Sequence, residues 1–270
     1  MILLTKKEDI EKIKYLFKDI RYHMGNSVLD GCMGNCYTDN LENPKFAMLI
    51  LRAYCYISGE ISKEEFMNIF NEFKLEEKVI IPSDDLKDII KQNFNNYKIT
   101  KRYSIKKNPE FKIEKLKENI NKMDSSKYTI KKIDVQLANR IKQEEFMKIT
   151  DDYENFGIGF CCFYGDQIVG VASSNIFYEN GIEVNIKVHP EHRRNNIALA
   201  LASSLILECT SKNKQISWDA AHLGSVKLAE KLGFEFDSEY ECFDFLNYNK
   251  NDMKKEIQEI IDKYKVRGAS

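Results

Sequence analysis

The chain has 270 residues, 43% of them hydrophobic, so it is long enough for one large domain or two smaller ones. Its 41 basic and 42 acidic side chains leave a formal net charge of −1. This balance gives no basic surplus for a nucleic-acid-binding surface, and no apolar stretch is long enough to span a bilayer. We therefore expect neither nucleic acid nor membrane as a partner.

The cysteines point to a reducing environment. Their number, 7, is odd, and the chain does not open with the charged and apolar regions of a secretory leader. Cys32 and Cys36 have no second pair at metal spacing, and Cys161 and Cys162 should face opposite sides of a strand. We expect buried thiols, no metal site and a cytoplasmic protein.

A first helix is predicted near the start of the chain. Thr5 and Glu8 have the spacing of a capping box, and apolar residues on one helical face follow. These apolar residues are Ile10, Ile13, Leu16, Phe17 and Ile20.

Strands and helices then alternate up to about residue 125. Ser62 and Glu65 form a second capping box, before a helix whose apolar face holds Phe66, Ile69, Phe70 and Phe73. The other elements predicted here are strands at 36–39, 46–57, 79–81 and 99–105, and helices at 84–94 and 114–123. We place a boundary near Ser125 and Ser126, which gives domains of residues 1–125 and 126–270.

The C-terminal half begins with a hairpin over residues 159–174, which turns at Gly165 and Asp166. In the next strand, 181–188, Glu183, Asn185 and Lys187 alternate with apolar residues and lie on the opposite face. The elements predicted after it are a helix at 197–210, a strand at 216–218, a helix at 225–234 stopped by Gly233, a strand at 234–245, and a docking helix carrying Met253, Ile257, Ile260, Ile261 and Tyr264.

Residues 188–202 have the pattern of an anion-binding turn. A strand breaks at Pro190, and a helix rich in small residues starts after Arg193 and Arg194. The first N–H groups of a helix have no intrahelical acceptor, and the helix dipole adds partial positive charge there. The two arginines place full charges beside these N–H groups.

The pattern Arg193-x-x-Asn196-x-Ala198 resembles the acyl-CoA pyrophosphate loop of the GNAT (GCN5-related) N-acetyltransferases, whose motif is Gln/Arg-x-x-Gly-x-Gly/Ala. Asparagine replaces the usual glycine, and it is a residue that tolerates positive φ. The order of elements also matches, and the chain is most similar to a bacterial GNAT group that includes relatives of a zwittermicin A resistance protein. Other strings that carry the resemblance are Gly31-Cys-Met-Gly34, Gly157-Ile-Gly-Phe160, Trp218-Asp-Ala220 and residues 225–234.

The resemblance implies an α/β (α+β) fold, with a mixed central sheet flanked by helices in the C-terminal half. The N-terminal α/β lobe is interpreted as a degenerate GNAT-like domain that lacks a cradle with arginines and so does not bind CoA. Acetyl-CoA is the implied co-substrate. The residues implied to contact it are Ile186, Lys187 and Val188 along the pantetheine, Arg193, Arg194, Asn195, Asn196, Ile197 and Ala198 at the pyrophosphate, and His222 and Ser225 at the next helix.

Glu183 is the candidate general base, since it lies on the strand that runs beside the thioester in this family. A salt-bridged or solvated strand carboxylate is the alternative interpretation. His222 stands where the family has asparagine, and either replaces its hydrogen bond or caps the helix. Ala229 stands where many relatives have a tyrosine acid, so Tyr240 is a further candidate acid, unless it is a core residue.

Two functions remain open. The first is transfer of an acetyl group to a primary amine of a small molecule, such as an antibiotic or metabolite, by direct attack in a ternary complex. The second is a non-catalytic acyl-CoA-binding or interaction protein that keeps the anion-binding turn with Arg193 and Arg194. The sequence is compatible with a monomer or a homodimer.

Overall fold

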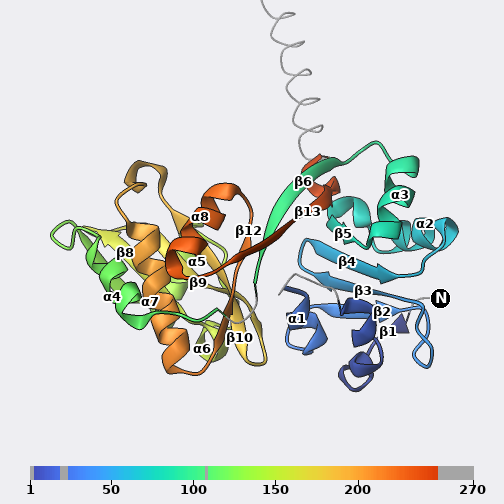
Figure 1. Ribbon diagram of the computed structural model, residues 1–270, viewed down its shortest axis with the longest axis horizontal. Coiled ribbons are helices and arrows are strands. Elements are labelled where there is room, and N and C mark those ends of the chain that lie inside the picture. The colour runs from blue at the N-terminus through green and yellow to red at the C-terminus, as the bar shows by residue number, and fades with distance from the viewer. Residues whose placement is uncertain (1–2, 19–23, 107–108, 249–270) are drawn as a thin grey trace, which may run out of the picture. The chain divides into compact units, whose positions relative to one another are not determined.

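A computed structural model describes residues 3–18, 24–106 and 109–248 (Figure 1). The chain forms two compact units. Of the described residues, 3–18, 34–101 and 241–248 belong to the first unit, and the rest belong to the second.

The elements of the first unit, in chain order, are β1 (Leu3–Leu4), η1 (Lys7–Lys12), η2 (Lys14–Phe17), β2 (Asn35–Thr38), β3 (Phe46–Leu51), β4 (Tyr54–Gly59), α2 (Lys63–Glu72), η3 (Leu75–Glu77), β5 (Val79–Pro82) and α3 (Asp84–Asn93). Strands β1 to β4 are antiparallel neighbours, and β5 runs parallel to β4. Phe66 of α2 and Ile90 of α3 are fully buried in the core that these helices form with the sheet.

The predicted first helix is wrong in kind. Two short 3-10 helices occupy its place, and Lys6 precedes the first of them without a side-chain cap. Ile10, Ile13 and Phe17 are nevertheless buried, because spacings of three and four residues keep these side chains on one side of the chain. Ile20 lies outside the described residues.

The predicted strand at 46–57 is two strands. β3 and β4 form a hairpin, and Arg52 at its turn has a φ of 55°. The sequence does not mark this turn clearly, because most residues of both strands are apolar and buried and Arg52 is the one charged residue in 46–57. The predicted capping box of α2 is confirmed. The Ser62 side chain accepts the Glu65 N–H at 3.2 Å, and the Glu65 carboxylate accepts the Ser62 N–H at 2.9 Å.

The elements of the second unit, in chain order, are α1 (Met24–Leu29), α4 (Ile113–Asn121), β7 (Tyr128–Lys132), α5 (Val135–Gln143), α6 (Tyr153–Phe156), β8 (Gly159–Tyr164), β9 (Gln167–Tyr178), β10 (Gly181–Val188), η4 (Pro190–His192), α7 (Ile197–Ser211), β11 (Gln215–Ser217), β12 (Asp219–Ala220) and α8 (Leu223–Leu232). Two strands have residues in both units: β6 (Lys98–Ile105) belongs to the second unit from residue 102 onward, and β13 (Phe236–Asp244) up to residue 240. The main sheet of the second unit has the order β11-β10-β9-β8-β7, with β10 and β11 parallel and the other pairs antiparallel. The predicted hairpin, strand and two helices are confirmed, and Gly233 ends α8 with a φ of 104°.

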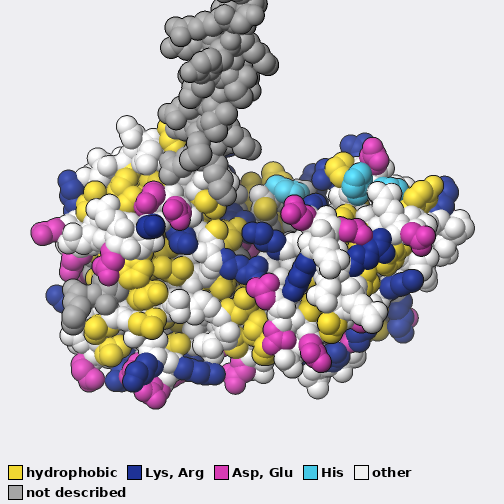
Figure 2. All heavy atoms as spheres, turned by 180° about the vertical axis from the view of Figure 1, so that it is seen from behind, with side chains coloured by type: hydrophobic (Ala, Val, Ile, Leu, Met, Phe, Trp, Pro, Cys, Tyr) yellow, Lys and Arg dark blue, Asp and Glu magenta, His cyan; other side chains and the backbone are white. Residues whose placement is uncertain are grey.

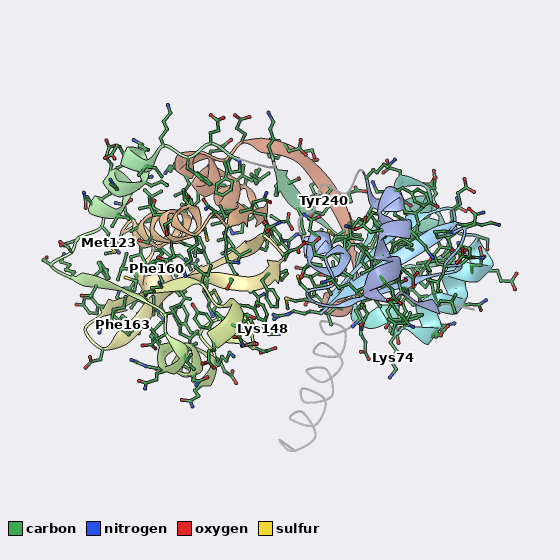
Figure 3. All side chains as sticks on the ribbon, turned by 90° about the horizontal axis from the view of Figure 1, so that it is seen from below. Lys74, Met123, Lys148, Phe160, Phe163 and Tyr240 are labelled. Atoms are coloured by element: carbon green, nitrogen blue, oxygen red, sulfur yellow. The ribbon has the colours of Figure 1, made fainter. Side chains whose placement is uncertain are left out.

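The units do not divide near residue 125, where we placed the boundary. Leu116 of α4 and Met123, which is labelled in Figure 3, lie in the same apolar core as α7, so residues 109–125 belong to the second unit. The C-terminal docking helix predicted at 253–264 lies outside the described residues.

The same order of elements occurs in both units. Three antiparallel strands are followed by a helix, a strand parallel to the third, and a second helix. The strand that follows each second helix is exchanged between the two units. β6 follows α3 but pairs with β12 of the second unit, while the end of β13 follows α8 but pairs with β5 of the first.

Candidate active site

The sheet of the second unit opens at one point. β10 and β11 pair only from Gly181 to Glu183, and the chain then leaves to form β12 against β6. β10 continues to Val188 beside β9, with a register shift between Glu183 and Val184. Along this stretch, the outward N–H and C=O groups have no parallel strand to bond among the described residues, so they are available to a ligand.

The three residues predicted to line the pantetheine are in this open stretch. Ile186 and Val188 are half-buried and Lys187 is exposed, as expected at a strand edge. The Lys187 ammonium lies 5.2 Å from the centre of the Phe146 ring.

The basic turn follows directly from β10. After η4, residues 193–196 lead into α7, and Arg194 and Asn196 have φ values of 65° and 60°. Asn196 is therefore in the left-handed region that favours glycine. Its side-chain amide donates to the Lys122 carbonyl at 3.0 Å, which ties the turn to the segment after α4.

Charge and free donors come together in this turn. The side chains of residues 193–196 are exposed, and the N–H groups of residues 197–199 begin α7 without intrahelical acceptors. Figure 2 also shows histidine side chains at the surface, on a face that carries Lys and Arg side chains. The turn can therefore hold an exposed anion such as a diphosphate.

Helix α7 holds this turn in place because it is buried almost all round. Leu201, Leu205 and Ile206 are fully buried in the core. Gly170 of β9 permits the close approach of the helix, since a Cβ there would lie 2.7 Å from Ile197 Cγ2. The fixed helix axis keeps the first turn of α7 next to the end of β10.

Glu183 lies where β10 and β11 part. Its carboxylate is buried, and Oε1 accepts the Asp219 N–H at 2.6 Å, while Oε2 contacts the Ser217 hydroxyl. Burial, and next the charge of Asp219, raise the pKa of Glu183 to about 8. The salt-bridged or solvated strand carboxylate that we considered for this residue is not what the structure shows.

Ser217 contacts two acceptors next to Glu183. Its hydroxyl contacts Glu183 Oε2 as a donor, and Ser217 Oγ also lies 3.1 Å from the Ile182 carbonyl oxygen. A hydroxyl has one proton to donate, so the Ile182 carbonyl competes with the carboxylate for it. The bond from Ser217 lowers the pKa of Glu183 and opposes the effect of burial.

Asp219 connects Glu183 to two further residues. Its Oδ2 accepts from Arg102 Nε at 2.7 Å and from the Tyr240 hydroxyl at 2.8 Å. Its side chain is 3% exposed, and Oδ1 has no hydrogen-bond partner among the described residues. Burial raises the pKa of Asp219, and the charge of Arg102 opposes this. Tyr240 is labelled in Figure 3.

The three predicted catalytic residues do not lie together. Glu183 and Tyr240 are linked through Asp219, whereas His222 is exposed and caps α8, where its Nδ1 accepts the Ser225 N–H at 3.1 Å. Ser225 in turn accepts from the Trp218 indole at 3.0 Å. Among the described residues, no group of three or more His, Cys, Asp or Glu side chains is arranged to hold a metal ion.

Arg102, Ser217 and Asp219 are the residues that sequence reasoning missed. Asp219 comes directly after a predicted strand and Trp218, which was a usable local signal for a residue at the strand's end. The sequence around Arg102 gave no such signal, because this residue reaches the site only through the pairing of β6 with β12 of the second unit.

A sheet that opens beside a helix N-terminus is the fold of the GNAT class of acyltransferases. Residues 14–243 match the family model of the GNAT acetyltransferases, and the chain belongs to that family. Proteins of this family generally use acetyl-CoA, and membership supports an acyltransferase in general. The searched curated proteins contain no match to the chain.

Solved structures agree with this assignment. A GCN5-related N-acetyltransferase-like protein from Streptococcus suis is 28% identical, with a TM-score of 0.78 over 88% of this chain and 98% of that one. A Drosophila protein is 10% identical, with a TM-score of 0.54 over 90% and 97% of the two chains. A GNAT-family putative acetyltransferase from Novosphingobium aromaticivorans is 9% identical, with a TM-score of 0.51 over 82% and 93%. The last two are similar in fold alone.

No helix in the described part of the chain is long and apolar enough to cross a bilayer.

Proposed function

We propose that the protein is an acetyl-CoA-dependent N-acetyltransferase that acts on a primary amine of a small molecule. The observation that carries this proposal is the position of Glu183, a buried carboxyl group at the point where β10 and β11 part. The open edge of β10 runs from this carboxyl group to the basic turn, so one strand connects a proton acceptor with an anion site.

The residues would act in sequence along this strand. The turn at 193–198 holds the diphosphate, and the backbone of residues 186–188 bonds the pantetheine amides. Glu183 takes a proton from the acceptor ammonium, and the amine nitrogen then forms a bond to the thioester carbon while the C–S bond breaks. The second proton lost from nitrogen passes to the departing sulfur.

A negative site favours a cationic acceptor. When Glu183 and Asp219 are ionised, their two negative charges and the positive charge of Arg102 give these three side chains a net charge of about −1 before transfer. Proton uptake by Glu183 neutralises it. This supports a protonated amine as the acceptor, in preference to a neutral alcohol.

The alternative, an acyl-CoA-binding protein without catalysis, is favoured by a specific observation. The Tyr240 hydroxyl donates to Asp219, and His222 caps a helix, so neither candidate acid has a free role in the arrangement described. Transfer then depends on Glu183 alone, with no dedicated acid for the thiolate.

Two measurements separate these functions. Calorimetry tests binding of acetyl-CoA, and free-thiol release with a panel of primary amines tests transfer, with Glu183→Gln as the comparison. We expect binding by both proteins and transfer by the wild type, with kcat/KM rising with pH through about 8 because the carboxylate is the active form. Binding without transfer to any amine would favour the alternative, and folded protein that does not bind would exclude both.

A further inference from the structure

Arg102 holds the residue that supports Glu183. Its Nε and Nη2 both lie 2.7 Å from Asp219 Oδ2, and Nη2 also lies 3.3 Å from the Asp219 carbonyl oxygen. Asp219 donates its own N–H to Glu183 Oε1. The guanidinium therefore fixes both the side chain and the backbone of the residue next to the proposed base.

We propose that Arg102 is a positioning residue for acetyl transfer, which neutralises and orients Asp219 so that Glu183 can release its proton and act as the base. This inference rests on the proposed function. It depends on the charges of three side chains: Arg102 and Asp219 lie on the paired strands β6 and β12, and Glu183 lies on β10, a strand of the other sheet.

The groups that face Glu183 come from every neighbouring strand. They are Tyr178 of β9, Ser217 of β11, Asp219 of β12, Arg102 of β6 and, through Asp219, Tyr240 of β13. Burial raises the pKa of Tyr178 to about 12, so this phenol stays neutral. Among these groups Arg102 is the cation, and its charge lowers the pKa of Glu183 against the effects of burial and of Asp219.

Counting charges shows what Arg102 supplies. Two ionised carboxylates beside one guanidinium carry a net charge of about −1, which becomes neutral when Glu183 takes a proton. Without the guanidinium, the same two carboxylates would carry about −2 in a buried place, which is costly. Glu183 would then lose its proton only at a pH still further above neutrality, and less of it would be ionised as the base at any given pH.

The site needs residues from both halves of the sequence, because β6 is exchanged between the units. Arg102 lies on β6, which follows the helices of the first unit, and β6 pairs with β12 through Ser104 and Asp219. The second half of the sequence therefore does not contain the complete site.

The test measures the protonation of Glu183 directly. Infrared difference spectra against Glu183→Gln report the C=O stretch of the protonated carboxyl group as a function of pH, and need no turnover. The same series is run on Arg102→Gln, Arg102→Lys, Asp219→Asn and the double variant Arg102→Gln/Asp219→Asn. Arg140→Gln is the matched control, since Arg140 pairs with Glu144 on the surface of α5.

We expect Arg102→Gln to move the Glu183 midpoint up by about one pH unit or more, and to lower kcat/KM at pH 7 about tenfold. Arg102→Lys keeps the positive charge, so its Glu183 midpoint should lie nearer that of the wild type. Asp219→Asn should move the midpoint down, and the double variant should reverse the rise caused by Arg102→Gln. Arg140→Gln should leave it unchanged.

An unchanged midpoint in Arg102→Gln, or a double variant that does not reverse the shift, would overturn the proposal. If Arg102→Gln does not fold, the double variant decides, because a purely structural arginine predicts the same Glu183 midpoint in the double variant as in Asp219→Asn, whereas the proposal predicts a higher one. Failure of the proposed function is a separate result: no amine would be acetylated by the wild type, whatever the infrared titration shows.

Discussion

At the scale of the single residue, burial dominates the chemistry of Glu183. The carboxyl group is at the end of a paired stretch of sheet, and its neighbours include a hydroxyl, a backbone N–H and a carboxylate. Two hydrogen bonds and a guanidinium only partly offset the loss of water. The pKa of Glu183 therefore lies near neutral pH, whereas a glutamate on the protein surface would be fully ionised there.

This burial predicts a pH-dependent stability. The folded pKa of Glu183, about 8, is above the ordinary value of 4.5, so between these values the folded state binds a proton that the unfolded state has lost. Stability must fall as pH rises through this window. Glu183→Gln cannot ionise, so its unfolding free energy relative to wild type should rise by on the order of 4 kcal/mol between pH 5 and pH 9.

Urea unfolding at several pH values checks this prediction, with the Arg140→Gln protein as the control for a surface charge change. A constant difference between wild type and Glu183→Gln across the range would show that Glu183 ionises as an ordinary surface carboxyl group does.

A second prediction at this scale concerns Asn196. Its φ of 60° costs a residue with a Cβ about 1 kcal/mol, and asparagine tolerates it better than alanine. Asn196→Ala should therefore lower both stability, by about 1 kcal/mol, and affinity for acetyl-CoA. Asn196→Gly should keep the affinity, although it loses the bond to the Lys122 carbonyl. Calorimetry on both variants decides, and equal affinities would show that the backbone conformation is not what matters.

At the scale of the element, local patterns predicted those parts whose signals are local. The capping box of α2, the alternation in β10 and the glycine after α8 each act within a few residues, and each gave the right element. The first helix failed because Thr5 to Glu8 has only the spacing of a capping box, and two 3-10 helices bury the same apolar residues. The prediction missed the β3–β4 turn because most residues of both strands are apolar and buried, and Arg52 alone between them was not a sufficient turn signal.

The packing of α7 against β9 gives a prediction for an element. A methyl group at Gly170 would lie 2.7 Å from Ile197 Cγ2 and 2.9 Å from Leu201 Cδ1, so Gly170→Ala must push α7 away from the sheet. We expect a loss of about 1–3 kcal/mol in stability. We also expect weaker binding of acetyl-CoA, because the first turn of the helix forms the basic turn's donors.

The control adds the same methyl group elsewhere. Gly224 in the first turn of α8 is exposed, and a Cβ there meets only the His222 ring, at 3.1 and 3.3 Å. Gly224→Ala should stay within about 1 kcal/mol of wild type in thermal unfolding. If Gly170→Ala unfolds at the same temperature as this control, the contact between α7 and β9 is looser than the structure implies.

At the scale of the whole molecule, the exchanged strands explain what the sequence did not reveal. The cradle and Glu183 lie on consecutive elements, so a linear pattern was enough to find them. Arg102 and Asp219 are 117 positions apart, and the strand that joins them follows a different helix. We placed the boundary near residue 125 because no local sequence signal marks a strand that pairs outside the unit it follows.

The exchange predicts that β13 stabilises the unit it does not follow in sequence. Phe243 is fully buried in the core of the first unit, with Phe66 and Ile80, although the helix before it belongs to the second. Phe243→Ala should cost about 3–5 kcal/mol and should speed amide hydrogen exchange in β5 and α2 first. Phe236→Ala, on the same strand but 40% exposed, should cost about 1 kcal/mol or less. Faster exchange confined to α7 and β10 in Phe243→Ala would mean that β13 supports the second unit instead.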